Sequence, residues 1–97
     1  MNFLDLDSNS LYVYDKIKEI YGDGFLSDLY LNKSNIKSVI SYLKSLGIKC
    51  INELLIYKID VFFKDVDFLE CEIKKFDVSE FVNLVNDDYF MIDNYLF

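Results

Sequence analysis

The stretch Ser34-Asn-Ile-Lys-Ser-Val-Ile-Ser-Tyr-Leu-Lys-Ser-Leu-Gly47 decides the fold class. Its apolar residues recur at helical spacing, and lysines and serines occupy the opposite face. The apolar positions are Ile36, Val39, Ile40, Leu43 and Leu46. Gly47 follows directly, at the position where a glycine commonly closes a helix. This stretch therefore predicts an amphipathic α-helix with a glycine at its C-terminal end.

Four further segments show the same kind of apolar stripe. The first spans Leu11–Tyr21 with Val13, Ile17 and Ile20 on its stripe, and it stops at Gly22-Asp-Gly24. The stripe of the second is formed by Ile51, Leu54, Leu55, Ile59 and Phe62, and that of the third by Val66, Leu69, Ile73 and Phe76. The fourth opens with Asp77-Val-Ser-Glu80, which has capping-box spacing. The short segments 25–31 and 89–97 are also compatible with helices.

A small α+β domain is the alternative fold. Leu11-Tyr-Val-Tyr14 and Leu29-Tyr-Leu31 contain strand-forming residues, but neither is flanked by a hairpin turn. The chain has three glycines and no proline, which leaves few places for tight turns. We therefore predict a single acidic all-α domain over residues 1–97, built as a compact bundle of about five short amphipathic helices.

The composition excludes several classes of function. Seven residue types are absent, namely Ala, Arg, Gln, His, Pro, Thr and Trp. Without His there is no His-based acid–base catalysis and no His metal ligand, and without Arg there is no bidentate contact to phosphate or guanine. The net charge of −7 argues against direct nucleic-acid binding. We expect no enzymatic activity, no cofactor and no metal site.

The N-terminal residues and the apolar run lengths predict the compartment. Met1-Asn-Phe-Leu-Asp-Leu-Asp7 has no basic lead, and uninterrupted apolar stretches are far shorter than the ~20 residues of a membrane-spanning helix. We expect a soluble cytoplasmic protein with no membrane partner. Cys50 and Cys71 are then predicted to be free, largely buried thiols. Three of the missing residue types, Ala, Pro and Arg, have G- and C-rich codons, while Lys, Asn, Ile, Phe and Tyr are abundant. This bias indicates an AT-rich genome such as that of a low-GC bacterium or its phage.

Two stretches of the chain align with each other. Glu53-Leu-Leu-Ile-Tyr-Lys-Ile-Asp60 lies over Glu80-Phe-Val-Asn-Leu-Val-Asn-Asp87 at an offset of 27 residues. The pattern Leu43-Lys-Ser-Leu-Gly-Ile48 followed by Glu53-Leu-Leu is similar to repeats of the mitochondrial transcription termination factor type. The chain departs from that family, because it lacks the proline of the repeat and is acidic where those proteins are basic. The resemblance implies helical repeats and no function.

Charge is distributed unevenly along the chain. Residues 1–31 carry six acidic residues and two lysines, residues 32–64 carry two acidic residues and six lysines, and residues 65–97 carry nine acidic residues and two lysines. One interpretation is that the lysine-rich middle docks between the acidic flanks and neutralises them. The other is that an acidic face stays exposed and meets a basic partner.

The C-terminal third is the better candidate for such a face, because aromatic and acidic side chains alternate there. Acidic groups steer association with a basic partner, and aromatic side chains supply the buried contact. The candidate partner-binding residues are Asp65, Asp67, Glu70, Glu72, Asp87, Asp88, Tyr89, Phe90, Asp93 and Tyr95. The apolar ending Tyr95-Leu-Phe97 is predicted either to dock into the core or to form a homodimer interface.

These features favour a small acidic inhibitor that binds a basic protein partner. It would occupy the basic surface of a nucleic-acid-handling effector, as a phage counter-defence protein of the anti-CRISPR or anti-restriction type. One alternative is an immunity protein against a nuclease toxin. Another is a self-associating structural or adaptor module. The sequence identifies neither the partner nor the oligomeric state.

Overall fold

The computed structural model describes residues 2–96, which are predominantly helical and contain no strand. The all-α prediction is confirmed, and the α+β alternative is wrong for these residues. The α-helices are α1 (Tyr12–Tyr21), α2 (Asp23–Leu31), α3 (Lys33–Leu46), α4 (Ile51–Tyr57), α5 (Val66–Lys74), α6 (Val78–Asp87) and α7 (Asp93–Leu96). Three short 3-10 helices accompany them, namely η1 (Ser8–Ser10), η2 (Ile59–Phe63) and η3 (Tyr89–Ile92).

The prediction of about five helices is wrong in number, because residues 2–96 form seven α-helices. The predicted apolar stripe from Ile51 to Phe62 is interrupted at Lys58, where the backbone leaves the helical region and separates α4 from η2. The segment 25–31 falls within α2, and residues 89–96 form η3 and α7. A single residue, Gly22, separates α1 from α2, since its φ of +91° ends the first helix.

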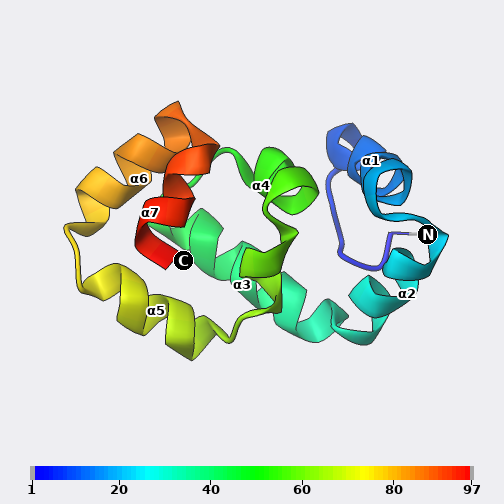
Figure 1. Ribbon diagram of the computed structural model, residues 1–97, viewed down its shortest axis with the longest axis horizontal. Coiled ribbons are helices and arrows are strands. Elements are labelled where there is room, and N and C mark those ends of the chain that lie inside the picture. Colours follow the sequence, from blue (N-terminus) through cyan, green and yellow to red (C-terminus); the bar gives the residue numbers. More distant parts are fainter. Residues whose placement is uncertain (1, 97) are drawn as a thin grey trace.

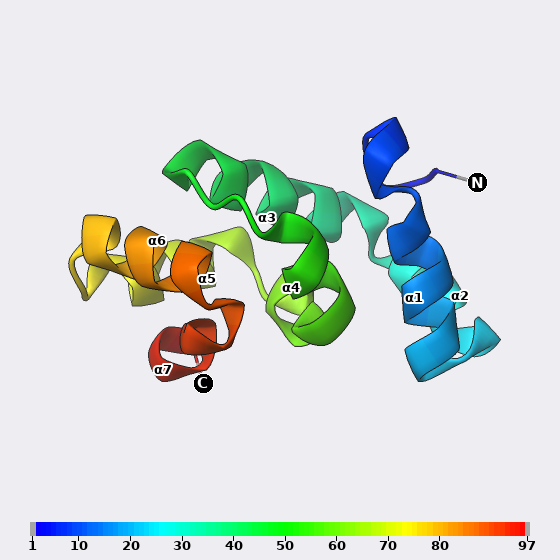
Figure 2. The ribbon, with the colours of Figure 1, turned by 90° about the horizontal axis from the view of Figure 1, so that it is seen from above.

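The long helix α3 runs through the middle of an elongated molecule that measures 37 × 24 × 21 Å (Figures 1 and 2). It contacts α2, α4, η2 and α5. Figure 1 shows α1 and α2 at one end of the molecule and α5, α6 and α7 at the other, with α4 between them. The helix α4 contacts α1. The central elements therefore join the two ends.

One cluster of buried apolar side chains forms the core, and α3 supplies much of it. Ile36, Val39 and Leu43 are completely buried, and Ile40 is nearly so, as their spacing predicted. Full burial of each such side chain stabilises the fold by about 1.5–3 kcal/mol. Gly47 closes α3 in the left-handed conformation with φ +99°. In two of the other predicted stripes one position is wrong, because Ile20 and Phe76 remain exposed.

The order of elements occurs twice in the chain. A first unit consists of α3, α4 and η2, and a second unit consists of α5, α6 and η3. The helices α4 and α6 begin 27 residues apart, at Ile51 and Val78, which is the offset at which their sequences align. The second unit is followed by α7, which contacts α5 and η3. This arrangement places η3 and α7 beside the end of α4.

No helix in the described part of the chain combines the length and the apolar character needed to cross a bilayer.

Candidate functional site

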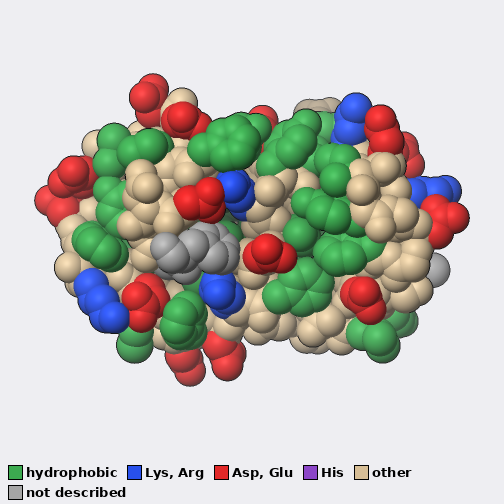
Figure 3. All heavy atoms as spheres, viewed as in Figure 1, with side chains coloured by type: hydrophobic (Ala, Val, Ile, Leu, Met, Phe, Trp, Pro, Cys, Tyr) green, Lys and Arg blue, Asp and Glu red, His purple; other side chains and the backbone are tan. Residues whose placement is uncertain are grey.

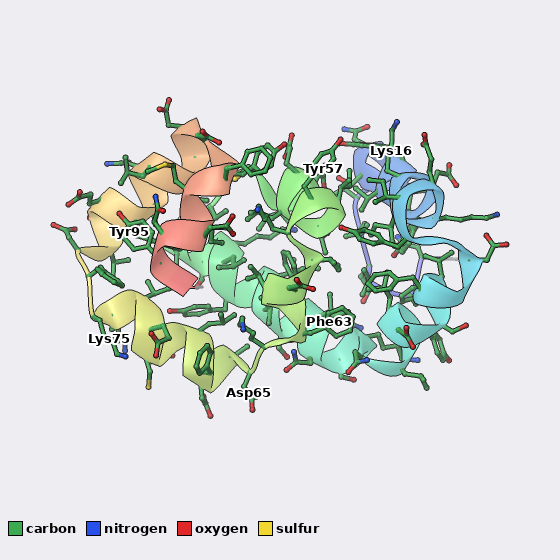
Figure 4. The ribbon with its side chains drawn as sticks, in the orientation of Figure 1. Lys16, Tyr57, Phe63, Asp65, Lys75 and Tyr95 are labelled. Atoms are coloured by element: carbon green, nitrogen blue, oxygen red, sulfur yellow. The ribbon has the colours of Figure 1, made fainter. Side chains whose placement is uncertain are left out.

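The predicted partner-binding residues fall into separate groups in space. Asp65, Asp67, Glu70 and Glu72 belong to the start and body of α5. The remaining residues lie on α6, η3 and α7 or at their junctions, and they are Asp87, Asp88, Tyr89, Phe90, Asp93 and Tyr95. Figure 4 shows Asp65 at the lower edge of the molecule. At the upper edge it shows Tyr57, the last residue of α4, whose ring stacks on that of the predicted residue Tyr89. The structure thus divides the predicted surface.

Two acidic residues of α5 form ion pairs within their own helix region. Glu70 lies 2.6 Å from the ammonium of Lys74, and Glu72 lies 3.0 Å from that of Lys75. Such exposed pairs at helical spacing contribute little to stability, because water screens them. They nevertheless reduce the negative potential along α5. The α5 group is therefore a weaker candidate for recognising a basic partner than its sequence indicates.

The aromatic ring of Tyr95 is partly buried and packs against the core. Its centroid lies 4.9 Å from that of Phe76 and 5.0 Å from that of the fully buried Phe81, and both contacts are edge-on. Such edge-to-face contacts favour a fixed position for the ring. Of the segment predicted to mediate a homodimer, the side chain of residue 96 and all of residue 97 lie outside the described residues. That homodimer remains a prediction.

The structure brings Tyr89 and Phe90 together with the end of α4. Asp88 begins η3, since its carboxylate accepts a hydrogen bond of 3.0 Å from the backbone N–H of Phe90. The Tyr89 ring stacks on the Tyr57 ring, with centroids 5.8 Å apart and planes 16° from parallel. Phe90 is 54% exposed. The short helix η3 therefore presents an apolar ring to solvent beside two stacked tyrosines.

Lys58 connects α4 to the second unit. Its ammonium lies 2.6 Å from a carboxylate oxygen of Asp93 and 4.7 Å from the centroid of the Phe90 ring. The Lys58 side chain is 18% exposed and that of Asp93 is 43% exposed. The pair is partly shielded from water, which strengthens the attraction relative to an exposed pair. It fixes the position of η3 and α7 against α4.

A shallow hollow of about 380 Å³ adjoins this ion pair and is lined by Tyr57, Lys58, Asp60 and Asp93. Nearby, the Tyr21 hydroxyl donates a 2.9 Å hydrogen bond to the carbonyl of Ile56. Burial, followed by the negative charge of Asp60, raises the pKa of Tyr21. Figure 3 shows hydrophobic side chains gathered over α4 and toward α1 and α2, with charged side chains beside them.

We call the region around this hollow the η3 surface. It combines two stacked tyrosines, one exposed phenylalanine, four carboxylates and one lysine. Its members are Tyr57, Lys58, Asp60, Asp87, Asp88, Tyr89, Phe90 and Asp93.

Sequence reasoning missed three members of the η3 surface, Tyr57, Lys58 and Asp60. They belong to the lysine-rich middle of the chain, where the charge pattern alone does not mark a binding site. One sequence feature could have indicated Lys58, namely the predicted docking of the lysine-rich middle on the acidic flanks. Lys58 does so at Asp93, and Lys37 does so at Asp5, 2.9 Å away.

Some acidic residues of the flanks are therefore neutralised by lysines of the middle of the chain, and others are not. Among the described residues, Asp65, Asp67, Asp87 and Asp88 form no ion pair. Asp87 and Asp88 precede the exposed Phe90, and Asp65 and Asp67 precede Phe68, which is 45% exposed. The first pair lies beside the stacked rings of Tyr57 and Tyr89, whereas the second lies near the ion-paired acids of α5. The η3 surface thus retains uncompensated negative charge beside aromatic side chains.

No group of three or more potential metal-ligating side chains occurs within residues 2–96. The half-buried Cys50 donates a 3.4 Å hydrogen bond to the Val85 carbonyl, and burial raises its pKa, which keeps the thiol protonated at neutral pH. Cys71 is exposed, so the prediction of two largely buried thiols is wrong for it.

Comparison with protein-family models, with curated proteins and with solved structures gives no match to this chain.

Proposed function

We propose that the chain is a protein-binding inhibitor that uses the η3 surface to occupy a basic surface of a nucleic-acid-handling protein. The observation that carries this proposal is the exposed ring of Phe90 beside Asp87 and Asp88, whose carboxylates form no ion pair within residues 2–96. An exposed aromatic side chain is an anchor that a partner can bury. Carboxylates around it select a partner of opposite charge.

The overall charge supports the same type of partner. A chain with net charge −7 attracts a basic surface over the distance of a Debye length, about 8 Å at physiological salt. Surfaces that bind nucleic acid are rich in Lys and Arg, since phosphate contacts dominate their affinity. The rings of Tyr57 and Phe90, 48% and 54% exposed, also offer apolar area that such a partner can bury.

The biological setting we propose is cytoplasmic counter-defence by a phage, of the anti-CRISPR or anti-restriction type. An immunity protein against a nuclease toxin would use the same surface and the same electrostatics. The identity of the captured target separates these two settings. Neither setting requires catalysis by the chain itself.

The test compares two variants that change the net charge equally. The site variant combines Asp87→Lys with Asp88→Asn, because Asn retains a side-chain oxygen for the N–H of Phe90. Lysine at the last residue of α6 also suits the helix C-terminus. The control combines Asp15→Lys with Asp7→Asn, at exposed residues of α1 and of the segment that precedes it.

Wild type and both variants are used to capture proteins from lysates of low-GC bacteria at low and high salt. We expect wild type and control to retain a basic nucleic-acid-handling protein that high salt releases and that the site variant fails to retain. Added in equimolar amount, wild type then inhibits that purified protein. Retention of the same partner by the site variant at low salt would contradict the proposal, as would an acidic partner.

A further inference from the structure

The helix α2 carries exposed apolar side chains in addition to its buried ones, although Asp23, Ser27 and Asp28 also lie on its surface. Leu29 is completely buried in the core, and Phe25 is half-buried against the stacked Tyr21 ring. On the other side Tyr30 is 45% exposed and Leu31 is 79% exposed. A surface helix ordinarily carries polar residues on the side that faces away from the core. The outer side of α2 therefore has the character of an interface.

A hollow lies on this outer side, with a volume of about 470 Å³. It is lined by Phe3, Leu26, Ser27, Tyr30 and Leu31. We call these five residues the α2 patch. The patch joins an apolar depression to the projecting side chain of Leu31 at the end of α2. A surface that holds both a projection and a depression can be complementary to itself across a two-fold axis.

The charges around the α2 patch are balanced, unlike those of the whole chain. The ammonium of Lys33 lies 3.6 Å from the centroid of the Tyr30 ring. Asp28 lies on α2 itself, and Lys37 pairs with Asp5 in the segment that carries Phe3. Two copies of a chain with net charge −7 repel each other. Two copies repel each other least at a surface where lysines and aspartates are equal in number. A two-fold axis can then place the lysines of one copy opposite the aspartates of the other.

We propose that the α2 patch docks a second copy of this chain, with Leu31 of each copy against the hollow of the other. Five side chains form a small interface beside the roughly 800 Å² per partner of a standard stable complex, so the dimer is weak and forms at high concentration. Figure 1 shows α2 at the end of the molecule opposite α5, α6 and α7. The dimer therefore leaves both η3 surfaces open.

This placement gives the dimer a consequence for binding. Two η3 surfaces in one particle can engage a partner that is itself dimeric or that offers repeated basic sites. The dimer does not depend on the proposed inhibition, since it uses α2 and the N-terminal segment. Its failure would leave the proposed function untouched.

Sedimentation equilibrium of the full chain tests the dimer over a range from about 10 μM to about 1 mM, where weak interfaces become populated. The variants Leu31→Lys and Leu31→Gln remove the projection with and without added charge. Ile20→Lys is the matched control, because Ile20 is an exposed apolar residue of α1 outside the patch. Circular dichroism verifies that each variant retains the wild-type helix content.

We expect the mean mass of wild type and of Ile20→Lys to rise from 11.5 kDa toward that of a dimer. Both Leu31 variants are expected to weaken dimerisation by at least about tenfold, which is the effect of losing one buried Leu side chain. A wild-type chain that stays monomeric at the highest concentration overturns the proposal. Dimerisation that is unchanged in both Leu31 variants, or lost equally in Ile20→Lys, also overturns it.

Discussion

The two units of the chain share an order of elements and differ in what their 3-10 helices do. In the first unit, η2 follows α4 and contacts α3, and its residues Ile59, Val61 and Phe62 are buried. In the second, η3 follows α6 and buries Ile92 but leaves Phe90 in solvent. The same order of elements therefore places η2 in the core and leaves part of η3 on the surface.

The difference follows from the position of each unit. The first unit lies in the middle of the molecule, where α3 and η2 have neighbours on several sides (Figures 1 and 2). The second lies at one end, where η3 contacts α6 and α7 and leaves the Phe90 ring 54% exposed. Repetition of element order therefore does not imply repetition of role.

The largest expected effect is the difference in stability between variants of two phenylalanines, one in η2 and one in η3. Replacing the fully buried Phe62 with Ala leaves a cavity and should destabilise the fold by about 3–5 kcal/mol. Phe90→Ala removes a ring that is half in solvent and should change stability by less than about 1 kcal/mol. Urea unfolding of both variants measures the difference. Equal losses would mean that η3 belongs to the core as η2 does.

A second, smaller effect concerns the ion pair between Lys58, at the end of α4, and Asp93, the first residue of α7. A double-mutant cycle with Lys58→Met and Asp93→Asn should give a coupling of about 1 kcal/mol, which falls with added salt. Solvent reaches the half-exposed Asp93, so the coupling stays below that of a buried pair. The pair between Lys16 and Glu19, 3.5 Å apart and exposed on both sides, is the control and should show a coupling near zero. A salt-independent coupling at Lys58 would point to packing of its stem.

A third effect compares the first turns of α5 and α6. The Asp77 carboxylate accepts a 3.2 Å hydrogen bond from the N–H of Glu80, whereas the Asp65 carboxylate caps no N–H of α5. Asp77→Ala should therefore cost about 1 kcal/mol and Asp65→Ala a few tenths, since only the first loses a capping bond. Thermal unfolding of the two variants tests this order, and the reverse order would contradict it.

The smallest effect is a loss of stability at alkaline pH. Burial raises the pKa of Tyr42 on α3 and of Tyr21 on α1 above the ordinary value of 10.0. In the unfolded chain these tyrosines ionise near pH 10, while the folded state still holds their protons. Stability is therefore complete below pH 10 and falls as the pH rises through the raised values. Tyr42→Phe should flatten this fall in a urea titration. A fall of the same size in wild type and in Tyr42→Phe would contradict the prediction.

Much of the fold could be predicted from local patterns. The spacing of Ile36, Val39 and Leu43 predicted a buried face, and Gly47 and Asp77 predicted helix ends that the structure contains. The break at Lys58 could not be predicted, because the apolar spacing continues through it. What ends α4 there is tertiary: Lys58 turns toward Asp93, and η2 packs under α3.

The site was predictable in composition and not in arrangement. Asp87, Asp88, Tyr89, Phe90 and Asp93 are close in sequence and share one surface. Asp65 and Asp67 belong to the same acidic third of the chain and lie elsewhere, since charge density along a sequence does not say which helices meet. The stacking of Tyr57 on Tyr89 joins residues 32 positions apart, and no local pattern announces it.

The central claim is that the second unit presents its 3-10 helix for binding, and hydrogen exchange of the chain with its captured partner tests it most directly. We predict that the partner slows amide exchange in residues 57–60 and 87–93 and leaves α1 and α2 unchanged. Slowed exchange confined to α5, or to α1 and α2, would contradict the assignment of the η3 surface as the binding site.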